Sequence, residues 1–166
     1  MRFVFFLALA GCDAPGDGPI GTDGPVVAGC DVGAEPQLWI GKGEQEWASS
    51  DDEDGRTLLV HGMQGGFHTF LSLRAQHLNL DQDWTLSVEG FLDGERTAWA
   101  DLVRTPECNG DADFGESIGT WLIWRAQPEE LHDQVVKIDV SVTDADGRVV
   151  SATEEQRIWD LRQVED

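Results

Sequence analysis

Three side chains that could bind a metal ion lie close together in the sequence. His61 and Met63 are two residues apart, so both would leave the same face of a strand, and His68 follows across a glycine-rich turn. Imidazole and thioether ligands together suit copper. A blue-copper arrangement fails, because Cys108 is followed by only one histidine, His132, and by no methionine. Copper binding is therefore the alternative. In our preferred interpretation these residues bind no metal: His61 is solvated, Met63 packs against its neighbours, and His68 forms a hydrogen bond with the turn backbone.

Acidic residues are concentrated in three short runs that could bind calcium. These runs are Ser50–Gly55, Asp111–Asp113 and Asp144–Gly147. Carboxylates on a tight loop supply the oxygen ligands that Ca²⁺ prefers, but none of the runs has the full EF-hand spacing. Asp144 and Asp146 are the best calcium candidates, because strands are expected to hold both ends of their loop. The simpler interpretation, which we prefer, is that the runs are solvated turns.

One segment, Gly115–Gly119, has the Gly-x-Ser-x-Gly pattern of serine hydrolases, with Ser117 in the nucleophile position. That motif needs a strand before it and a helix after it. Here a polar turn precedes the segment and the strand-like residues 120–125 follow it. His132 is the only histidine after Ser117, and no plausible triad acid lies between them. We therefore predict that the protein is not an enzyme.

Seven tryptophans raise the question of a carbohydrate-binding surface, since flat aromatic rings stack on sugars. Most of them are expected to belong to the core. Trp84 and Trp124 fall on inward-facing rows, whereas Trp121 and Trp99 are expected to face outward. If a glycan-binding face exists, Trp99 and Trp121 are its candidates, with Phe70 beside them.

The elements that must position these residues have a period of two. Alternation of apolar and polar residues predicts antiparallel strands with one buried face. The predicted inward rows are Phe67, Thr69, Leu71, Leu73 and Ala75; Trp84, Leu86 and Val88; Ile118, Thr120, Leu122, Trp124 and Ala126; and Val136, Ile138, Val140 and Val142. In the segment Thr57–His61, the same alternation puts Leu58 and Val60 on one face.

Turn residues separate these strands. Asp54-Gly55, Asp93-Gly94 and Asp146-Gly147 suit hairpin turns that require positive φ. Further strands are expected near Gln37–Ile40, Glu95–Val103 and Arg148–Ile158, and only Pro128–His132 suggests a helical turn. Seven to nine short strands predict an all-β fold, an antiparallel two-sheet sandwich of immunoglobulin-like type over residues 36–166. A small β-barrel is the alternative.

The N-terminus indicates an exported protein. Arg2 precedes an apolar run, Phe3–Ala10, which is too short to span a bilayer but suits a secretory signal peptide. The run ends in Leu9-Ala10-Gly11-Cys12, which resembles the lipobox of bacterial lipoproteins. The resemblance implies a signal peptide over residues 1–11, cleavage before Cys12, and acyl chains such as palmitate on Cys12. More than one chain gives stable anchoring. Residues 12–35, rich in Gly, Pro and Asp, are expected to form a flexible linker.

The two remaining cysteines follow from this assignment. An exported protein lies in a compartment where disulfides persist. With Cys12 lipidated, we predict a Cys30–Cys108 disulfide, the alternative being two free buried thiols. Asp13 resembles an inner-membrane retention signal in some Gram-negative lineages, so inner and outer membrane both stay open.

The net charge limits the partners. The chain has 166 residues, with 32 acidic and 11 basic side chains and a formal net charge of -21. Phosphate binding needs clustered Lys and Arg, so nucleic acid is excluded as a partner. Only five of the acidic residues precede residue 36, so most of the charge belongs to the folded domain. No later segment is long and apolar enough to span a bilayer, so the membrane would be contacted through the lipid alone.

The glycine-rich turn carries a second resemblance. Gly62, Gln64, Gly65, Gly66 and His68 match a Gly-x-Gln-Gly-Gly-x-His motif. The motif resembles that of an uncharacterised group of Gram-negative lipoproteins, in which Pro is common where this chain has Met63. The resemblance implies a β-sandwich and supplies no activity and no cofactor.

Together these observations predict a lipid-anchored protein of the Gram-negative cell envelope, facing the periplasm or the exterior. It would act as a non-catalytic binding or structural module, with an envelope protein or a glycan as partner. The alternative is an envelope metal-binding protein that uses copper at His61, Met63 and His68, or calcium at Asp144 and Asp146.

Overall fold

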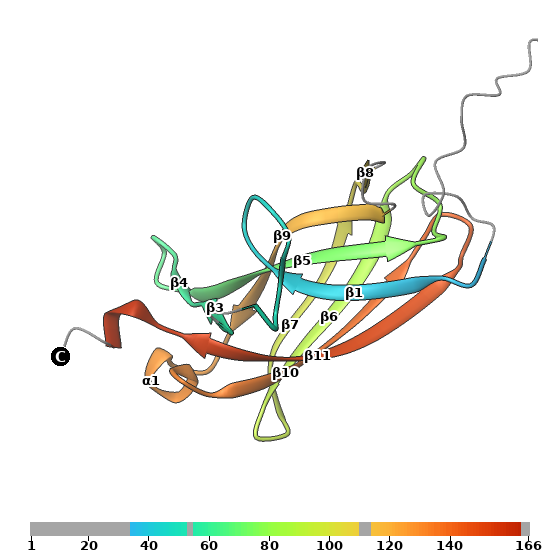
Figure 1. Cartoon of the computed structure of the whole chain (residues 1–166). Coiled ribbons are helices and arrows are strands. Elements are labelled where there is room, and N and C mark those ends of the chain that lie inside the picture. Colours follow the sequence, from blue (N-terminus) through green and yellow to red (C-terminus); the bar gives the residue numbers. More distant parts are fainter. Residues whose placement is uncertain (1–33, 53–54, 110–113, 164–166) are drawn as a thin grey trace, which may run out of the picture.

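The computed structural model describes residues 34–52, 55–109 and 114–163, and in this part of the chain nearly all regular structure is β (Figure 1). The all-β prediction is confirmed. The strands are β1 (Gln37–Lys42), β2 (Ala48–Ser49), β3 (Arg56–Leu58), β4 (Val60–His61), β5 (Phe67–Gln76), β6 (Trp84–Leu92), β7 (Glu95–Arg104), β8 (Glu107–Asn109), β9 (Phe114–Trp124), β10 (Val135–Thr143) and β11 (Val149–Trp159).

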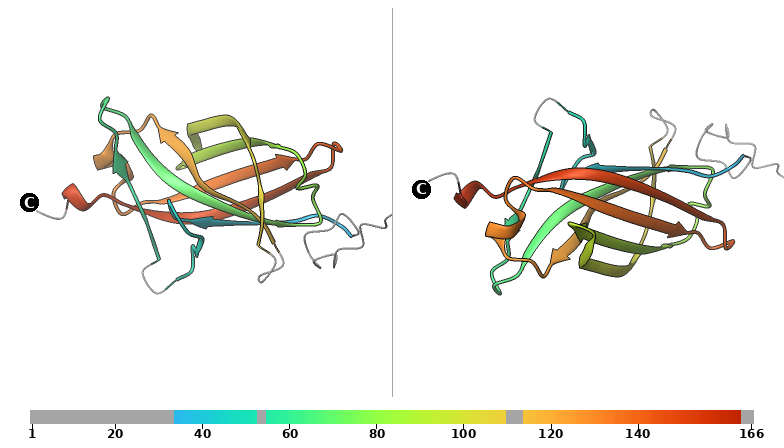
Figure 2. Two further views of the ribbon diagram at one scale, coloured as in Figure 1. Left: turned by 90° about the horizontal axis from the view of Figure 1, so that it is seen from above. Right: turned by 90° about the horizontal axis from the view of Figure 1, so that it is seen from below.

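The strands form one curled, open sheet that resembles half of a barrel. Its order is β2-β1-β5-β9-β7-β6-β10-β11-β3, with β4 added to β5 and β8 added to β9. Neighbouring strands are antiparallel, except that β3 pairs with β11 in parallel. The connection between β9 and β7 is narrow, since the only registered pair is Ala98 with Trp124. The curl brings β10 and β11 across from β5 (Figure 2).

The predicted alternation positions the core. In β6 and β10 the residues expected to face inward are buried, including Trp84, Leu86, Val136 and Ile138. Burying an apolar side chain of this size stabilises the fold by about 1.5–3 kcal/mol. The two inward-facing tryptophans, Trp84 and Trp124, are buried as predicted.

Two parts of the predicted pattern are wrong. Leu58 is exposed, while Thr57 and Leu59 are buried, because the segment leaves β11 at Leu58 and joins β5 at Val60. Ile118 is only half-buried, because Gly119 has a φ of +69° and shifts the inward row of β9 from Ser117 to Thr120. A strand that changes partner and a strand with an irregular residue both break the period of two.

Two of the three predicted hairpin turns join paired strands, whereas the turn at Gly55 joins β2 and β3, which pair with β1 and β11 and not with each other. Asp93 and Gly94 both have positive φ, as a type I′ hairpin between β6 and β7 requires, and Gly147 has a φ of +80°. Gly55 also has positive φ, whereas Asp54 lies outside the described residues. The predicted helical turn is α1 (Pro128–Leu131), which begins with proline and has a capping box formed by Gln127 and Glu130.

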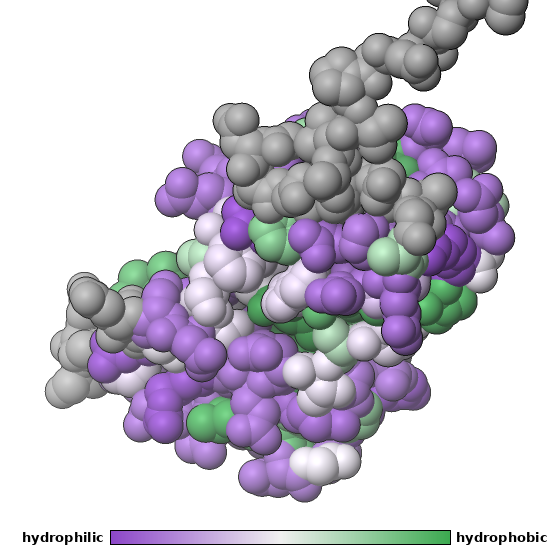
Figure 3. All heavy atoms as spheres, turned by 45° about the vertical axis from the view of Figure 1, so that its right-hand side comes forward, coloured by the Kyte–Doolittle hydropathy of each residue, from purple (hydrophilic) through white to green (hydrophobic). Residues whose placement is uncertain are grey.

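The predictions for the N-terminus lie outside the described residues. These predictions are the signal peptide, the lipidated Cys12, the linker as far as residue 33, and Cys30. Within the described part of the chain, no helix has the length and apolar character needed to cross a bilayer. The face of the molecule in Figure 3 is mainly hydrophilic, as the composition leads one to expect.

Candidate functional site

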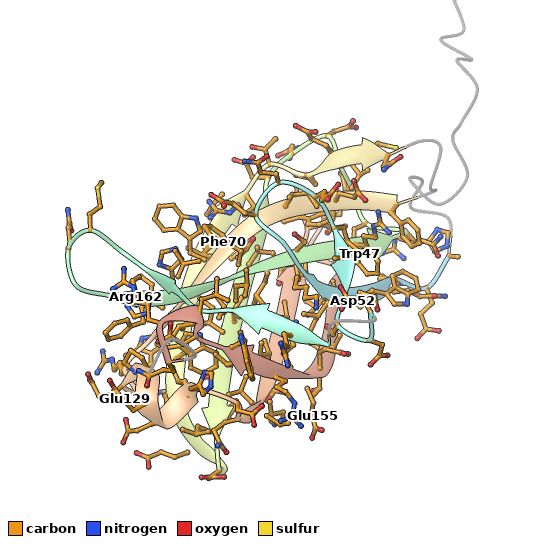
Figure 4. All side chains as sticks on the ribbon, turned by 60° about the vertical axis from the view of Figure 1, so that its left-hand side comes forward. Trp47, Asp52, Phe70, Glu129, Glu155 and Arg162 are labelled. Atoms are coloured by element: carbon orange, nitrogen blue, oxygen red, sulfur yellow. The ribbon has the colours of Figure 1, made fainter. Side chains whose placement is uncertain are left out.

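Four apolar or aromatic side chains lie together on the outer face of β5 and β9. The strand register places Phe70 opposite Trp121 and His68 opposite Ile123. The ring centroids of His68 and Phe70 are 5.0 Å apart, and those of His68 and Trp121 are 5.7 Å apart. We call these four residues the aromatic patch. Phe70 and Trp47 lie on the same outer side of the ribbon (Figure 4).

Two of the four residues of the aromatic patch are open to solvent, whereas His68 and Phe70 are half-buried. Trp121 and Ile123 are each 55% exposed, and Met63, at the tip of the adjacent turn, is fully exposed. Single exposed apolar residues are common on soluble proteins, but contiguous ones mark interaction sites. On a chain with a net charge of -21, such a patch stands out from its surroundings.

The glycine-rich turn forms a wall of a hollow beside this patch. The Gly62 amide donates to the Gly66 carbonyl at 2.8 Å, and the Gly65 amide donates to the Gly62 carbonyl at 3.0 Å. Gly65 has a φ of +85°, which glycine adopts without strain. The hollow has a volume of about 350 Å³ and is lined by the turn together with His68, Trp121 and Ile123. The motif is thus a hairpin turn that borders the aromatic patch.

A second hollow is lined in part by Phe70. Its volume is about 450 Å³, and the turn between β1 and β2 forms its rim. Leu58, Val60 and Phe70 give it apolar walls. The Lys42 ammonium lies at this hollow and donates to Asp52 Oδ1 and to the Arg56 carbonyl, each at 2.7 Å. This lysine is therefore already paired.

Two irregular positions in the strands hold the β1–β2 turn in place. Ser72, at the register shift in β5, donates its hydroxyl to the Gly43 carbonyl at 2.9 Å. Gly119 of β9 lies against the turn, because a Cβ there would be 2.6 Å from the Glu44 carbonyl oxygen. These contacts position Glu44 and Glu46, both exposed, at the edge of the second hollow.

The charge of Glu44 acts on the aromatic patch. Partial burial lowers the pKa of His68 below its ordinary value, because it disfavours the charged imidazolium. The negative charge of Glu44 opposes this effect without cancelling it. His68 is therefore a neutral ring at pH 7, which suits an apolar surface.

The predicted copper ligands do not converge. His61 is paired with Phe67 in the register and Val60 with His68, so His61 and His68 leave opposite faces of the sheet. His61 Nε2 is 3.0 Å from Asp160 Oδ1, and Met63 projects into solvent. Among the described residues, no three His, Cys, Asp or Glu side chains are grouped in a way that could hold a metal ion.

The two predicted calcium residues both accept hydrogen bonds at the β10–β11 turn. Asp144 is buried, and its Oδ1 accepts the amides of Asp146 and Arg148 at 3.0 and 2.8 Å. Its Oδ2 accepts the Asn79 amide at 2.9 Å. Asp146 accepts the Asn79 side-chain amide at 3.0 Å. The pair ties the β10–β11 turn to the segment after β5.

The Gly-x-Ser-x-Gly segment lies inside β9 rather than at a strand-to-helix turn. Ser117 is buried, and a Cβ at Gly115 would be 2.5 Å from a Leu80 methyl group. The second glycine, Gly119, contacts the β1–β2 turn. His132 accepts the Asp160 amide through Nδ1 at 3.2 Å, and its ring packs on Trp159. Both glycines of the segment thus have packing roles.

The structure separates the three glycan candidates. Phe70 and Trp121 are neighbours, but Trp99 lies on β7 with the Arg125 guanidinium 3.7 Å from its ring centroid and Arg96 at 5.2 Å. One ring face of Trp99 is therefore covered. Ile123 and the two glutamates of the β1–β2 turn were not predicted from the sequence. The signal that could have found the turn is Gly43, between an apolar strand and two acidic residues.

Cys108 lies in β8, paired with Gly115 of β9, and is disulfide-bonded. Because Cys30 lies outside the described residues, its pairing with Cys108 stays a prediction.

Comparison of the chain with protein-family models gives no match, and comparison with curated proteins and with solved structures gives no significant match.

Proposed function

We propose that this protein is a lipid-anchored, non-catalytic binding module of the Gram-negative cell envelope, and that the aromatic patch is its recognition surface. The observation that carries the proposal is the contiguous surface of half-buried Phe70 with exposed Trp121 and Ile123, which also line two hollows. A pocket of a few hundred cubic ångströms with mainly apolar walls is typical of binding sites. The anchor is the lipid on Cys12, as the lipobox resemblance implies.

The fold within this proposal is a sandwich-like arrangement of two half-sheets. One half contains β1, β5 and β9, and the other contains β7, β6, β10 and β11. The single registered pair between β7 and β9 supports this division. The recognition surface belongs to the outer face of the first half, so its occupation leaves the core undisturbed.

The test places a photo-crosslinking amino acid at position 123 of the lipidated protein in its native envelope. The matched control has the same amino acid at Val149, which is also exposed but lies on β11. We expect crosslinked products at position 123 that are absent at position 149, and that disappear when Trp121→Ala is added. Equal crosslinking at both positions, or products that survive Trp121→Ala, would overturn the proposal. A Cys12→Ser variant that stays in the membrane fraction would overturn the lipid anchor.

A further inference from the structure

We infer that the partner segment bound by the aromatic patch is an extended peptide in which apolar and basic side chains alternate. This inference rests on the proposed function and specifies the chemistry of its ligand. It follows from the charges at the patch, from the packing of the aromatic rings and from the residues that line the two hollows.

The unpaired charges beside the patch are negative. Glu44 and Glu46 are exposed and form no ion pair with any described residue. The nearby cations are already engaged, since Lys42 pairs with Asp52 and the Arg56 guanidinium lies 3.7 Å from the ring centroid of Trp159. A ligand that reaches this rim is therefore favoured when it carries positive charge.

The same argument disfavours a second copy of this chain as the occupant. Each copy carries a net charge of -21, and its acidic residues are spread over the folded domain. Two such surfaces repel each other over about 10 Å at moderate ionic strength. A basic partner gains from the same field, which raises its association rate.

The ring geometry favours a peptide over a sugar. His68 and Phe70 are packed edge to face, at 88°, and Phe70 and Trp121 at 80°. Sugar stacking needs a flat ring surface, whereas Phe70 stands edge-on to both other rings and the planes of His68 and Trp121 differ by 32°, so the three rings do not share one plane. The exposed aliphatic neighbours, Ile123 and Met63, add surface that suits peptide side chains.

The two hollows fit alternate side chains of one strand. The first is bordered by the glycine-rich turn and lined by Trp121, and the second is bordered by Glu44 and Glu46 and lined by Phe70, the register partner of Trp121. In an extended peptide, side chains on one face recur every two residues, at about 6.6–6.8 Å. An apolar side chain would occupy the first hollow, and a basic one would reach the glutamates.

The test measures binding of two synthetic twelve-residue peptides to the lipidated full-length protein in detergent. One peptide alternates Lys with Val and the other alternates Glu with Val. We expect the Lys peptide to bind, and the Glu peptide to bind at least tenfold more weakly. The double variant Glu44→Lys/Glu46→Lys should weaken binding of the Lys peptide at least tenfold, and Trp121→Ala should do the same.

The matched control is Asp101→Lys/Glu155→Lys, which changes the net charge equally at exposed positions on β7 and β11. It should leave the affinity for the Lys peptide within about twofold. Equal weakening by both double variants would show general charge attraction and overturn the inference. Circular dichroism checks folding, and Glu44→Gln/Glu46→Gln provides a milder variant with the same expected direction.

Two outcomes separate this inference from the proposed function. If crosslinking at position 123 depends on Trp121 but the Lys peptide does not bind, the recognition surface stands and the basic peptide is wrong. If a tetramer of N-acetylglucosamine binds, is lost in Trp121→Ala and is unaffected by Glu44→Lys/Glu46→Lys, the ligand is a glycan and the inference is overturned.

Discussion

At the scale of single residues, Asp160 has the most demanding environment. It is buried, its Oδ1 lies 3.0 Å from His61 Nε2 and accepts the Arg162 amide at 3.0 Å, and its Oδ2 has no hydrogen-bond partner among the described residues. Burial alone would raise its pKa, but the Arg162 amide and His61 outweigh burial and leave the pKa below its ordinary value. The carboxylate therefore joins β4 to the end of β11.

The lowered pKa of Asp160 makes part of the stability dependent on pH. Because the folded-state pKa is below the unfolded value of about 3.9, this contribution is present above about pH 4. It is lost as the pH falls from there through the folded-state pKa. We expect Asp160→Asn to lower the free energy of unfolding by about 1–3 kcal/mol at pH 7. The difference from wild type should shrink below pH 4.

Urea unfolding at pH 7 and at pH 3 measures both effects. The control is Asp133→Asn, which removes an exposed carboxylate paired with Arg157 at 2.9 Å. An exposed pair of this kind contributes about 1 kcal/mol or less. If the cost of Asp160→Asn is the same at both pH values, the carboxylate charge is not what stabilises this contact.

At the scale of elements, Gly119 links β9 to the β1–β2 turn beside the aromatic patch. It combines a left-handed φ with contact to the Glu44 carbonyl, so a side chain there is both strained and obstructed. Gly94 also has a left-handed φ, but nothing lies within 4 Å of a Cβ placed there. Substitutions at Gly119 and Gly94 therefore distinguish the effect of backbone strain, which both share, from the effect of displacing the β1–β2 turn, which only Gly119 has.

We expect Gly94→Ala to cost only the backbone strain, about 1–2 kcal/mol in the free energy of unfolding. Gly119→Ala should cost more, and it alone should weaken ligand binding at the aromatic patch, because the turn that carries Glu44 must move. Urea unfolding and crosslinking from position 123 measure the two effects. Equal costs for the two variants, with crosslinking unchanged, would show that the turn adapts without consequence.

The predictions from sequence succeeded where a strand keeps one partner on each side. In β6 and β10 the period of two gave the buried face correctly, because those strands lie between registered neighbours along most of their length. It failed at Leu58, where the chain passes from β11 to β5, and at Ile118, beside the irregular Gly119. The alternation of apolar and polar residues within a segment does not reveal where the segment changes its pairing strand or where its register shifts.

The candidate site was predictable only in part for the same reason. Phe70 and Trp121 were assigned to an outer face by alternation alone. That they are opposite each other depends on the β5–β9 register, and that Glu44 lies beside them depends on the contact between Gly119 and the β1–β2 turn. The sequence distance between Glu44 and Trp121 leaves no local signal for this proximity. Trp99 does not join Phe70 and Trp121 in one exposed surface, because it lies on β7 and the Arg125 guanidinium covers its ring.

At the scale of the whole molecule, the acidity and the aromatic patch have complementary effects. A strongly negative surface keeps the protein soluble and limits self-association, although it costs some stability through repulsion. Because the net charge limits self-association, the apolar side chains of the aromatic patch can stay exposed without causing aggregation. The same negative field would attract a basic partner over a long range. The partner would then be bound by short-range contacts with the aromatic patch.

The predicted Cys30–Cys108 disulfide belongs to this scale, because it would tie the chain just before the first described residue to β8. The loop that it closes contains about 80 residues, for which the chain-entropy relation gives about 4–5 kcal/mol of stabilisation. We expect the Cys30→Ser/Cys108→Ser variant to lose a large part of this stabilisation, measured as the free energy of unfolding in urea. Reducing agent should have little further effect on the stability of the variant.

Peptide mapping by mass spectrometry under non-reducing conditions tests the pairing directly. The mature protein should give one linked peptide containing Cys30 and Cys108, with no thiol available for labelling in the unfolded state. Detection of two labelled thiols, or of Cys108 linked to another molecule, would contradict the prediction. β8 pairs with the first residues of β9, and the same strand carries Trp121 and Ile123 toward its other end. The disulfide would therefore also hold the start of β9 in place. Its loss should therefore weaken crosslinking from position 123 as well as stability.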